Sequence, residues 1–503
     1  MKHIQHVKYL RLLVYAFFIF SACSKAHYTF NQKYAAPALQ EDVQVLRKVL
    51  EANHPSLYWY TPKDTIDTYF NRLETGITDS LTEIQFRNRV AETVGKIRCG
   101  HTSVRFSKAY YATVRKHRFP MFPLYLKTWK DSMVVVQSVW PKDSVFTRGT
   151  IVTAINGWKN KALLDSMFQL ISTDGYSDNY KSQVISGNFP AWYAVAFGQP
   201  SSFTIDYINA NGEQASTTIK AFVPVKDSTA NADSLLTKII VSKKEPHLGN
   251  RKLALLDKRA LYIDTIAHTA WMHLATFDGG RLRGFFRRSF KMMDRLHIQH
   301  LAIDLRENGG GTVEKSVLLT KYLKDTAFKV GDTVAAVSRS FQYRRYIKPW
   351  WVYWLPMHFT AHRMADGRIH QRRLEHHYYN PKQKHHFNGQ VYLVQGGYTF
   401  SAATMFEATL KGQKNVTLIG EETGGGYYGN SAMHLLNIQL PHSKLRIILP
   451  MYRLVMDKNR IKNGRGVMPD IPVYPSSQAI RNGKDPKLEE VKKRIKANSQ
   501  HAY

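Results

Sequence analysis

The amino-acid sequence predicts an α/β fold built around a largely parallel sheet. Between Leu261 and Lys411, short apolar runs of strand length alternate with segments whose apolar residues recur every three or four positions, a pattern typical of strands joined by helices. Two of the apolar runs end in glycine-rich turns that lead into helices. Because this alternation implies parallel strands, we expect the functional site at the carboxyl ends of the strands.

The two periodicities place the elements of this region. The expected strands are residues 261–266, 271–277, 301–305 and 391–394. The expected helices contain residues 286–293 and 317–322, span about 401–411, and begin again after Pro486 with Leu488, Val491 and Ile495 on one face.

A helical region precedes this alternation. Apolar residues recur at spacings of three and four from Val43 to Leu50, and the pattern continues to about Lys96. The predicted helix starts are Thr61, with Pro62 at the first helical position, and Ser80, paired with Glu83 in a capping box.

Between residues 106 and 225 short alternating runs replace the helical pattern and predict a β-rich domain. One run, residues 148–157, reads as a strand that ends in an Asn-Gly turn. The segment resembles a PDZ domain, which binds an extended peptide as an added strand. A β-rich spacer without a peptide groove is the alternative. The polar residues 226–250 predict a linker.

Chain length and net charge limit the expected number of domains and the expected class of partner. The chain has 503 residues, which predicts two or three domains, and its net charge of +33 favours contact with polyanions. We find no zinc-finger spacing, no basic heptad helix and no ribonucleoprotein motif, so nucleic acid is not the expected partner. An anionic membrane surface fits better.

The first residues predict export. Lys2, Lys8 and Arg11 precede an apolar stretch that closes with Ser21-Ala22-Cys23. This arrangement resembles a bacterial lipoprotein signal, which implies cleavage after residue 22 and a lipid on Cys23. An ordinary secretory signal is the alternative. We expect a protein anchored to a bacterial envelope membrane, on its periplasmic or outer-membrane side.

Two glycine-rich turns carry the candidate chemistry. After the expected strand 301–305 come Gly309, Gly310 and Gly311, whose backbone amides can approach a reacting group closely. After the strand 391–394 comes a glycine turn and then Ser401 at the start of a helix, where free N–H groups favour a developing oxyanion. A tight turn and a helix cap are the structural alternatives.

A third motif supplies a histidine. His101 lies directly after the helical region, between Gly100 and Thr102. A histidine on such a loop can act as a general base, although taken alone it is better explained as a surface histidine or one satisfied by hydrogen bonds.

Together the three motifs resemble peptidase family S41, the tail-specific or C-terminal-processing serine peptidases. The resemblance adds Gly420 to Gly425 (GEETGG), Gly466 to Val473 (GVMPDIPV) and His54 to Tyr58 (HPSLY), and it runs in order over residues 39–475. It implies a ClpP/crotonase-like core. The implied domains are a signal peptide (1–22), a tether (23–36), an N-terminal helical domain with the histidine motif (37–105), a PDZ-like domain (106–225), a linker (226–250), the peptidase core (251–475) and a basic C-terminal helix or tail (476–503).

The resemblance also implies the site. Some family members pair the serine with a lysine about 25 residues later, but position 426 is Gly. The tricorn-like members use a histidine from the helical region, which matches His101. Their usual glutamate before the GVxPD run corresponds here to Asn463. An amide stabilises an imidazolium less well than a carboxylate, and Glu421 or Glu422 could replace it.

The implied activity is hydrolysis of peptide bonds in protein or peptide substrates through an acyl-enzyme. Ser401 would be the nucleophile and His101 the base, with an oxyanion hole formed by the N–H groups of Gly309 or Gly310 and of Ala402. The resemblance requires no metal and no cofactor.

Two alternatives remain open. A weakly active or inactive peptide-binding lipoprotein on the same scaffold is favoured by Asn463, whereas acyl-CoA chemistry on a crotonase-type sheet leaves the PDZ-like region without a purpose. Residues 341–360, rich in aromatic and basic side chains, are expected to form a surface segment that contacts membrane or substrate, or to pack in the core.

Overall fold

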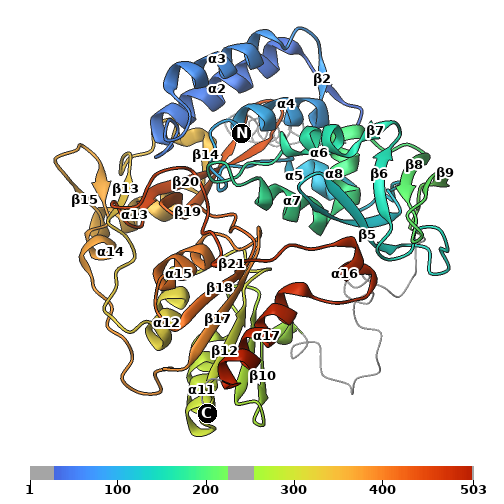
Figure 1. Cartoon of the computed structure of the whole chain (residues 1–503). Coiled ribbons are helices and arrows are strands. Elements are labelled where there is room, and N and C mark those ends of the chain that lie inside the picture. The colour runs from blue at the N-terminus through green and yellow to red at the C-terminus, as the bar shows by residue number, and fades with distance from the viewer. Residues whose placement is uncertain (1–27, 225–253, 501–503) are drawn as a thin grey trace, which may run out of the picture.

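The computed structural model describes residues 28–224 and 254–500. The predicted signal peptide, Cys23 and the whole predicted linker (226–250) lie outside these residues. Figure 1 shows a helical layer at one end, a β-rich unit to one side and a core sheet below. Across the two described ranges, no helix is both long and apolar enough to cross a membrane.

The N-terminal helical region is confirmed, but its predicted caps are wrong. Helix α4 begins one residue after Thr82, whose side chain forms a capping box with Gln85. Thr82 lies in strand β2, which pairs with β1, and this pairing ends the extended chain before Glu83. Thr61 instead donates to the carbonyl of Lys96. The elements here are β1 (Lys33–Tyr34), α2 (Ala36–Asn53), α3 (Lys63–Thr75), β2 (Leu81–Thr82), α4 (Glu83–Gly95), β3 (Val104–Arg105) and α5 (Lys108–Val114).

The β-rich unit contains an antiparallel sheet and three helices. Its strands follow the order β4-β5-β6-β8-β9, with β7 paired to β6. The strand β4 lies at the edge, and helix α7 packs against it through Thr128, whose backbone N–H donates to the Ser186 hydroxyl. The elements are β4 (Leu124–Trp129), β5 (Ser132–Ser138), β6 (Ile151–Ile155), β7 (Trp158–Lys159), α6 (Asn160–Phe168), α7 (Asp178–Gly187), α8 (Phe189–Phe197), β8 (Ser202–Ile208) and β9 (Gln214–Lys220).

The core sheet confirms the predicted α/β alternation. Its order is β10-β11-β12-β17-β18-β21, parallel except for the β10–β11 pair. Apolar side chains of α11, α12 and α15 share one core with the sheet, while Val491 and Ile495 of α17 pack on Ala302 and Tyr392. The elements are β10 (Arg259–Asp264), β11 (Thr269–Leu274), α11 (Leu282–Arg295), β12 (His300–Asp304), α12 (Val313–Leu323), β17 (Gln390–Gln395), α15 (Ala402–Leu410), β18 (Val416–Gly420), β21 (Ile471–Pro472), α16 (Ser477–Arg481) and α17 (Pro486–Gln500).

A second antiparallel sheet links the core to the helical layer. Its order is β14-β19-β20-β13-β16-β15, and β3 from the histidine region pairs with β20. This pairing brings the N-terminal region against the core. The elements are β13 (Thr333–Ala336), the 3₁₀ turn η1 (Arg344–Tyr346), β14 (Ile347–Lys348), α13 (Trp350–Thr360), β15 (His362–Arg363), β16 (Ile369–His370), α14 (Arg372–His376), β19 (Gly429–Gln439) and β20 (Arg446–Val455).

Candidate active site

Ser401 lies at the carboxyl end of the core sheet. Strand β17 ends at Gln395, a tight turn follows, and Ser401 precedes the first residue of α15. Its backbone has φ 53° and ψ −122°, a conformation that a residue with a Cβ rarely adopts. The strained turn holds the hydroxyl at the sheet edge, as in the strand-to-helix elbows that carry nucleophiles.

His101 reaches Ser401 from 300 residues away. Its Nε2 lies 3.1 Å from the Ser401 Oγ, within hydrogen-bond distance. The ring of Phe400 packs against the imidazole, with centroids 4.7 Å apart and planes inclined by 34°. The two motifs that the sequence singles out therefore meet in one site.

Burial controls the protonation of the imidazole. Desolvation of the charged form lowers the pKa of His101 to about 4. At neutral pH the ring is therefore uncharged and Nε2 can accept the proton of Ser401. In that tautomer Nδ1 carries a hydrogen, yet this buried atom has no hydrogen-bond partner among the described residues.

None of the three side chains expected to orient His101 contacts its Nδ1. Asn463 is exposed and accepts from the Arg465 N–H. Glu421 pairs with Lys487 at 2.7 Å. Glu422 accepts from the Gly466 N–H at 2.7 Å and binds the Arg465 guanidinium. These groups hold the loop that follows β18 rather than the imidazole.

A second histidine supports the loop that carries His101. The His54 Nδ1 accepts from the Ser56 N–H at 3.1 Å, so the opposite nitrogen carries the hydrogen and donates to the Thr102 hydroxyl at 2.8 Å. Burial lowers the pKa of His54 to about 3, which keeps the ring neutral in this role. The HPSLY motif thus fixes the residue next to His101.

Asp174 is a site residue that the sequence reasoning missed. Its Oδ1 accepts from the Gly100 N–H at 2.7 Å, one residue before His101, while its Oδ2 is buried without a partner among the described residues. Burial raises the pKa of the Asp174 carboxyl to about 7. No motif marks Asp174, because it lies in a loop of the β-rich unit 73 positions after His101.

Backbone amides surround the serine. A Cβ added at Gly310 would lie 2.7 Å from the Ser401 Cβ and 3.0 Å from the Ala402 nitrogen, so only glycine permits this approach. The Ala402 N–H is the first of helix α15, where N–H groups lack intrahelical acceptors. The Gly310 N–H donates to the Asn308 side chain at 2.9 Å.

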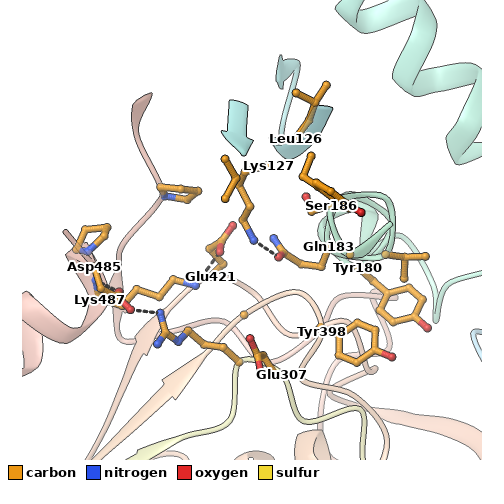
Figure 2. Close-up of a pocket in the computed structure, with 18 residues that line it drawn as sticks. Leu126, Lys127, Tyr180, Gln183, Ser186, Glu307, Tyr398, Glu421, Asp485 and Lys487 are labelled. Carbon is orange, nitrogen blue, oxygen red and sulfur yellow. Dashed lines mark hydrogen bonds and ion pairs between the residues drawn. The ribbon is translucent and has the colours of Figure 1, made fainter. Parts of the chain in front are cut away.

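A pocket of about 940 Å³ lies at the carboxyl edge of the core sheet, where Glu307, Tyr398 and Glu421 line it. It lies between strand β4 and helix α7 on one side and the core on the other. Figure 2 shows Lys127, Glu421 and Lys487 pointing toward it. Lys127 binds the amide oxygen of Gln183, whereas Lys487 binds Glu421. Leu126, Lys127, Tyr180, Gln183 and Tyr398 are among the residues that line the pocket.

An aromatic stack joins this pocket to His101. Tyr398 stacks on Tyr180 at 5.9 Å, and Tyr180 stacks on Phe400 at 4.9 Å, which in turn packs on His101. Tyr398 also lies beside Gly309, where an added Cβ would be 3.1 Å from its ring. The described residues contain no cluster of three or more His, Cys, Asp or Glu side chains that could hold a metal ion.

Comparisons with known proteins find a family likeness in sequence and a likeness in fold. Residues 268–473 match the sequence model of peptidase family S41. No curated protein sequence matches the chain significantly. Mature CPAF has a similar structure, with a TM-score of 0.62 and 13% identity over 92% of this chain and 97% of that chain. CPAF complexed with lactacystin gives a TM-score of 0.61 at 13% identity, over 92% and 98% of the two chains.

These likenesses show the fold. They extend over nearly the whole described chain, so they include the helical layer and the β-rich unit as well as the core. A tricorn protease chain is also similar, with 12% identity over 92% of this chain and 37% of that chain, but its TM-score of 0.38 supports no argument.

Proposed function

We propose that the chain is a serine endopeptidase acting through an acyl-enzyme, with its peptidase domain in residues 268–473, which match the model of peptidase family S41. The observation that carries the proposal is the 3.1 Å contact between His101 Nε2 and Ser401 Oγ, beside the free end of helix α15. A neutral base, a hydroxyl and converging N–H groups are the parts that acyl transfer needs.

The proposed reaction begins when a peptide carbonyl reaches Ser401. The Oγ forms a bond to the carbonyl carbon as its proton passes to His101 Nε2, and the carbonyl electron pair moves to the oxygen. Collapse of the intermediate breaks the C–N bond, and the proton passes from His101 to the leaving amine. Water then repeats the two steps on the ester and releases the acid.

Backbone amides stabilise the oxyanion in this scheme. The Ala402 N–H is one donor, and Gly309 supplies the second because the Gly310 N–H is already bonded to Asn308. Each such donor contributes about 3 kcal/mol to the transition state.

The charge on His101 needs a different partner from the expected carboxylate. The face of Phe400 lies against the ring, and an aromatic face attracts a cation by about 0.5–2 kcal/mol. Asp174 contributes by holding the Gly100 backbone. Because no acceptor for Nδ1 lies within residues 28–224 and 254–500, this arrangement is weaker than a complete triad, and this observation favours the low-activity alternative.

We propose that substrate enters through the pocket between β4 and α7. An extended segment would add to the edge strand near Leu126, as in PDZ-type recognition. Lys127, whose ammonium binds a neutral amide rather than a carboxylate, would attract an acidic side chain or chain terminus. Tyr398 would then guide the segment past Gly309 toward Ser401.

The enzyme is proposed to work in the bacterial cell envelope. The support is the lipoprotein-like leader that ends at Cys23. Labelled palmitate should enter the wild-type chain in cells but not Cys23→Ser, and that variant should leave the membrane fraction. Undiminished labelling of Cys23→Ser would place the lipid elsewhere or exclude this anchor.

Activity is tested with an unfolded protein as substrate. Ser401→Ala and His101→Ala should each lower cleavage by about 10³-fold or more, because both partners of the proton transfer are needed. Ser340→Ala, an exposed serine, is the matched control and should keep wild-type activity. If neither site variant changes cleavage, or if well-folded wild-type protein cleaves nothing, the peptidase proposal fails in favour of the binding-protein alternative.

A further inference from the structure

Helix α13 exposes an unusual amount of apolar surface. Five of its large side chains are at least 39% accessible: Trp351 (65%), Val352 (40%), Trp354 (39%), Leu355 (54%) and Phe359 (76%). Exposed single apolar residues are ordinary, but a cluster on one short helix marks a contact site.

The helix is held firmly by its opposite side. Met357 is buried, and Trp350 and Tyr353 pack against the main core. Just before the helix, Ile347 pairs with Ile438 of β19 in the antiparallel sheet. The expectation that residues 341–360 pack in the core is therefore right only for residues such as Trp350, Tyr353 and Met357. The rings on the opposite side of the helix face solvent.

Basic side chains outnumber acidic ones in the segment that contains the helix. Residues 341–378 contain seven Arg or Lys and two acidic residues, Asp366 and Glu375. The Arg344 guanidinium lies 5.0 Å from the Trp350 ring. Glu375 is buried and accepts from the Val334 N–H, so it does not offset the charge outside. We call the exposed cations of this segment the basic rim; they are Arg344, Arg345, Lys348, Arg363, Arg372 and Arg373.

We propose that α13 is an interfacial helix that docks this protein on an anionic lipid bilayer. Its tryptophans would lie at the headgroup level, and the basic rim would contact lipid phosphates. Eleven residues span about 16 Å, roughly half the hydrocarbon thickness, so the helix lies on the bilayer and does not cross it.

Charge favours lipid over the other occupants. A symmetric contact with a second copy would place one basic rim against another, and like charges at an interface are unfavourable. An apolar substrate segment would use the rings but leave the rim without a partner. Only an anionic surface uses both features.

Vesicle flotation tests the proposal. The full-length protein with Cys23→Ser should float with vesicles of phosphatidylglycerol and phosphatidylcholine, and much less with phosphatidylcholine alone. Adding Trp351→Ser, Trp354→Ser and Phe359→Ser together should lower binding at least about tenfold. Replacing Arg344, Arg345 and Lys348 with Gln should lower it by about 100-fold, since each cation adds about fivefold.

Matched controls separate this outcome from others. The triple change Trp140→Ser, Trp158→Ser and Tyr262→Ser removes equally exposed rings elsewhere and should leave flotation unchanged. Equal flotation of the α13 aromatic variant and wild type would overturn the proposal. So would a wild-type dimer in solution that this variant converts to a monomer, because the rings would then face a second copy. Peptidase activity on a soluble substrate should be unchanged, so this proposal and the peptidase proposal can fail separately.

Discussion

At the scale of single residues, the site combines strain with incomplete pairing. Ser401 has a backbone conformation that costs on the order of 1–3 kcal/mol, which the surrounding packing must offset. The His101 Nδ1 and the Asp174 Oδ2 are both buried without partners among the described residues. Such features cluster at functional sites, and here they lie on two loops that meet through the hydrogen bond from Gly100 to Asp174.

The pH dependence of kcat/KM reports the pKa of His101. Because burial lowers this pKa to about 4, the neutral base persists well below the usual range of histidine. We expect kcat/KM to fall on the acid side near pH 4, measured on a substrate without ionisable groups near the cleaved bond. An acid limb near pH 6.5 would show that the imidazole is not desolvated in the free enzyme.

Asp174 makes the folded state sensitive to pH. Its folded pKa of about 7 lies above its ordinary value of 3.8, so the native carboxyl keeps a proton that the unfolded chain releases. Its stabilising contribution is present below pH 4 and is lost as the pH rises to 7. Asp174→Asn cannot titrate, so it removes this pH-dependent loss of stability. Its amide oxygen can still accept from the Gly100 N–H.

Urea unfolding at pH 5 and pH 8 measures this effect. The free energy of unfolding of Asp174→Asn, relative to wild type, should be roughly 2–3 kcal/mol more favourable at pH 8 than at pH 5. A pH-independent difference between the two proteins would mean that Asp174 titrates normally.

At the scale of elements, the sequence predicts those whose patterns are local. The strand–turn–helix units around Gly309 and Ser401 were predictable because strand burial, glycine and helix periodicity follow one another along the chain. Strand β20 was missed because it is buried on nearly all sides and contains Pro450, so it lacks the alternation of a half-exposed strand.

Contacts between distant residues select among the local structures that the sequence pattern allows. Both Ser80 with Glu83 and Thr82 with Gln85 fit a capping box, and the pairing of Thr82 with Lys33 selects the second. The same reason explains Asp174, whose role depends on contact with Gly100 across 74 positions.

A substitution at Gly310, in the turn after β12, tests how closely this turn must approach Ser401. Gly310→Ala should lower kcat by at least about 10²-fold, because its Cβ would displace Ser401 or Ala402. Gly212→Ala is the matched control, with a similar positive φ of 87° but no neighbour within 4 Å, and should cost stability without loss of kcat. Full activity of correctly folded Gly310→Ala would exclude the proposed oxyanion hole.

At the scale of the whole molecule, three separate regions complete one site. The helical layer provides His101, the β-rich unit provides Asp174 and one wall of the pocket, and the core provides Ser401 with its amides. The sequence predicted the serine and histidine partners from their motifs. It did not predict that Nδ1 lacks an acceptor in the described part of the chain, since this depends on where Asn463, Glu421 and Glu422 find other partners.

The central claim is that Ser401 is a nucleophile activated by His101. A biotinylated fluorophosphonate, followed by peptide mass spectrometry, should label wild-type protein at Ser401 and label His101→Ala at least about 10²-fold more slowly. Asp174→Asn should still be labelled, because it leaves the contact between the two side chains in place. Labelling of another serine, or an unlabelled Ser401 in folded protein, would contradict the account.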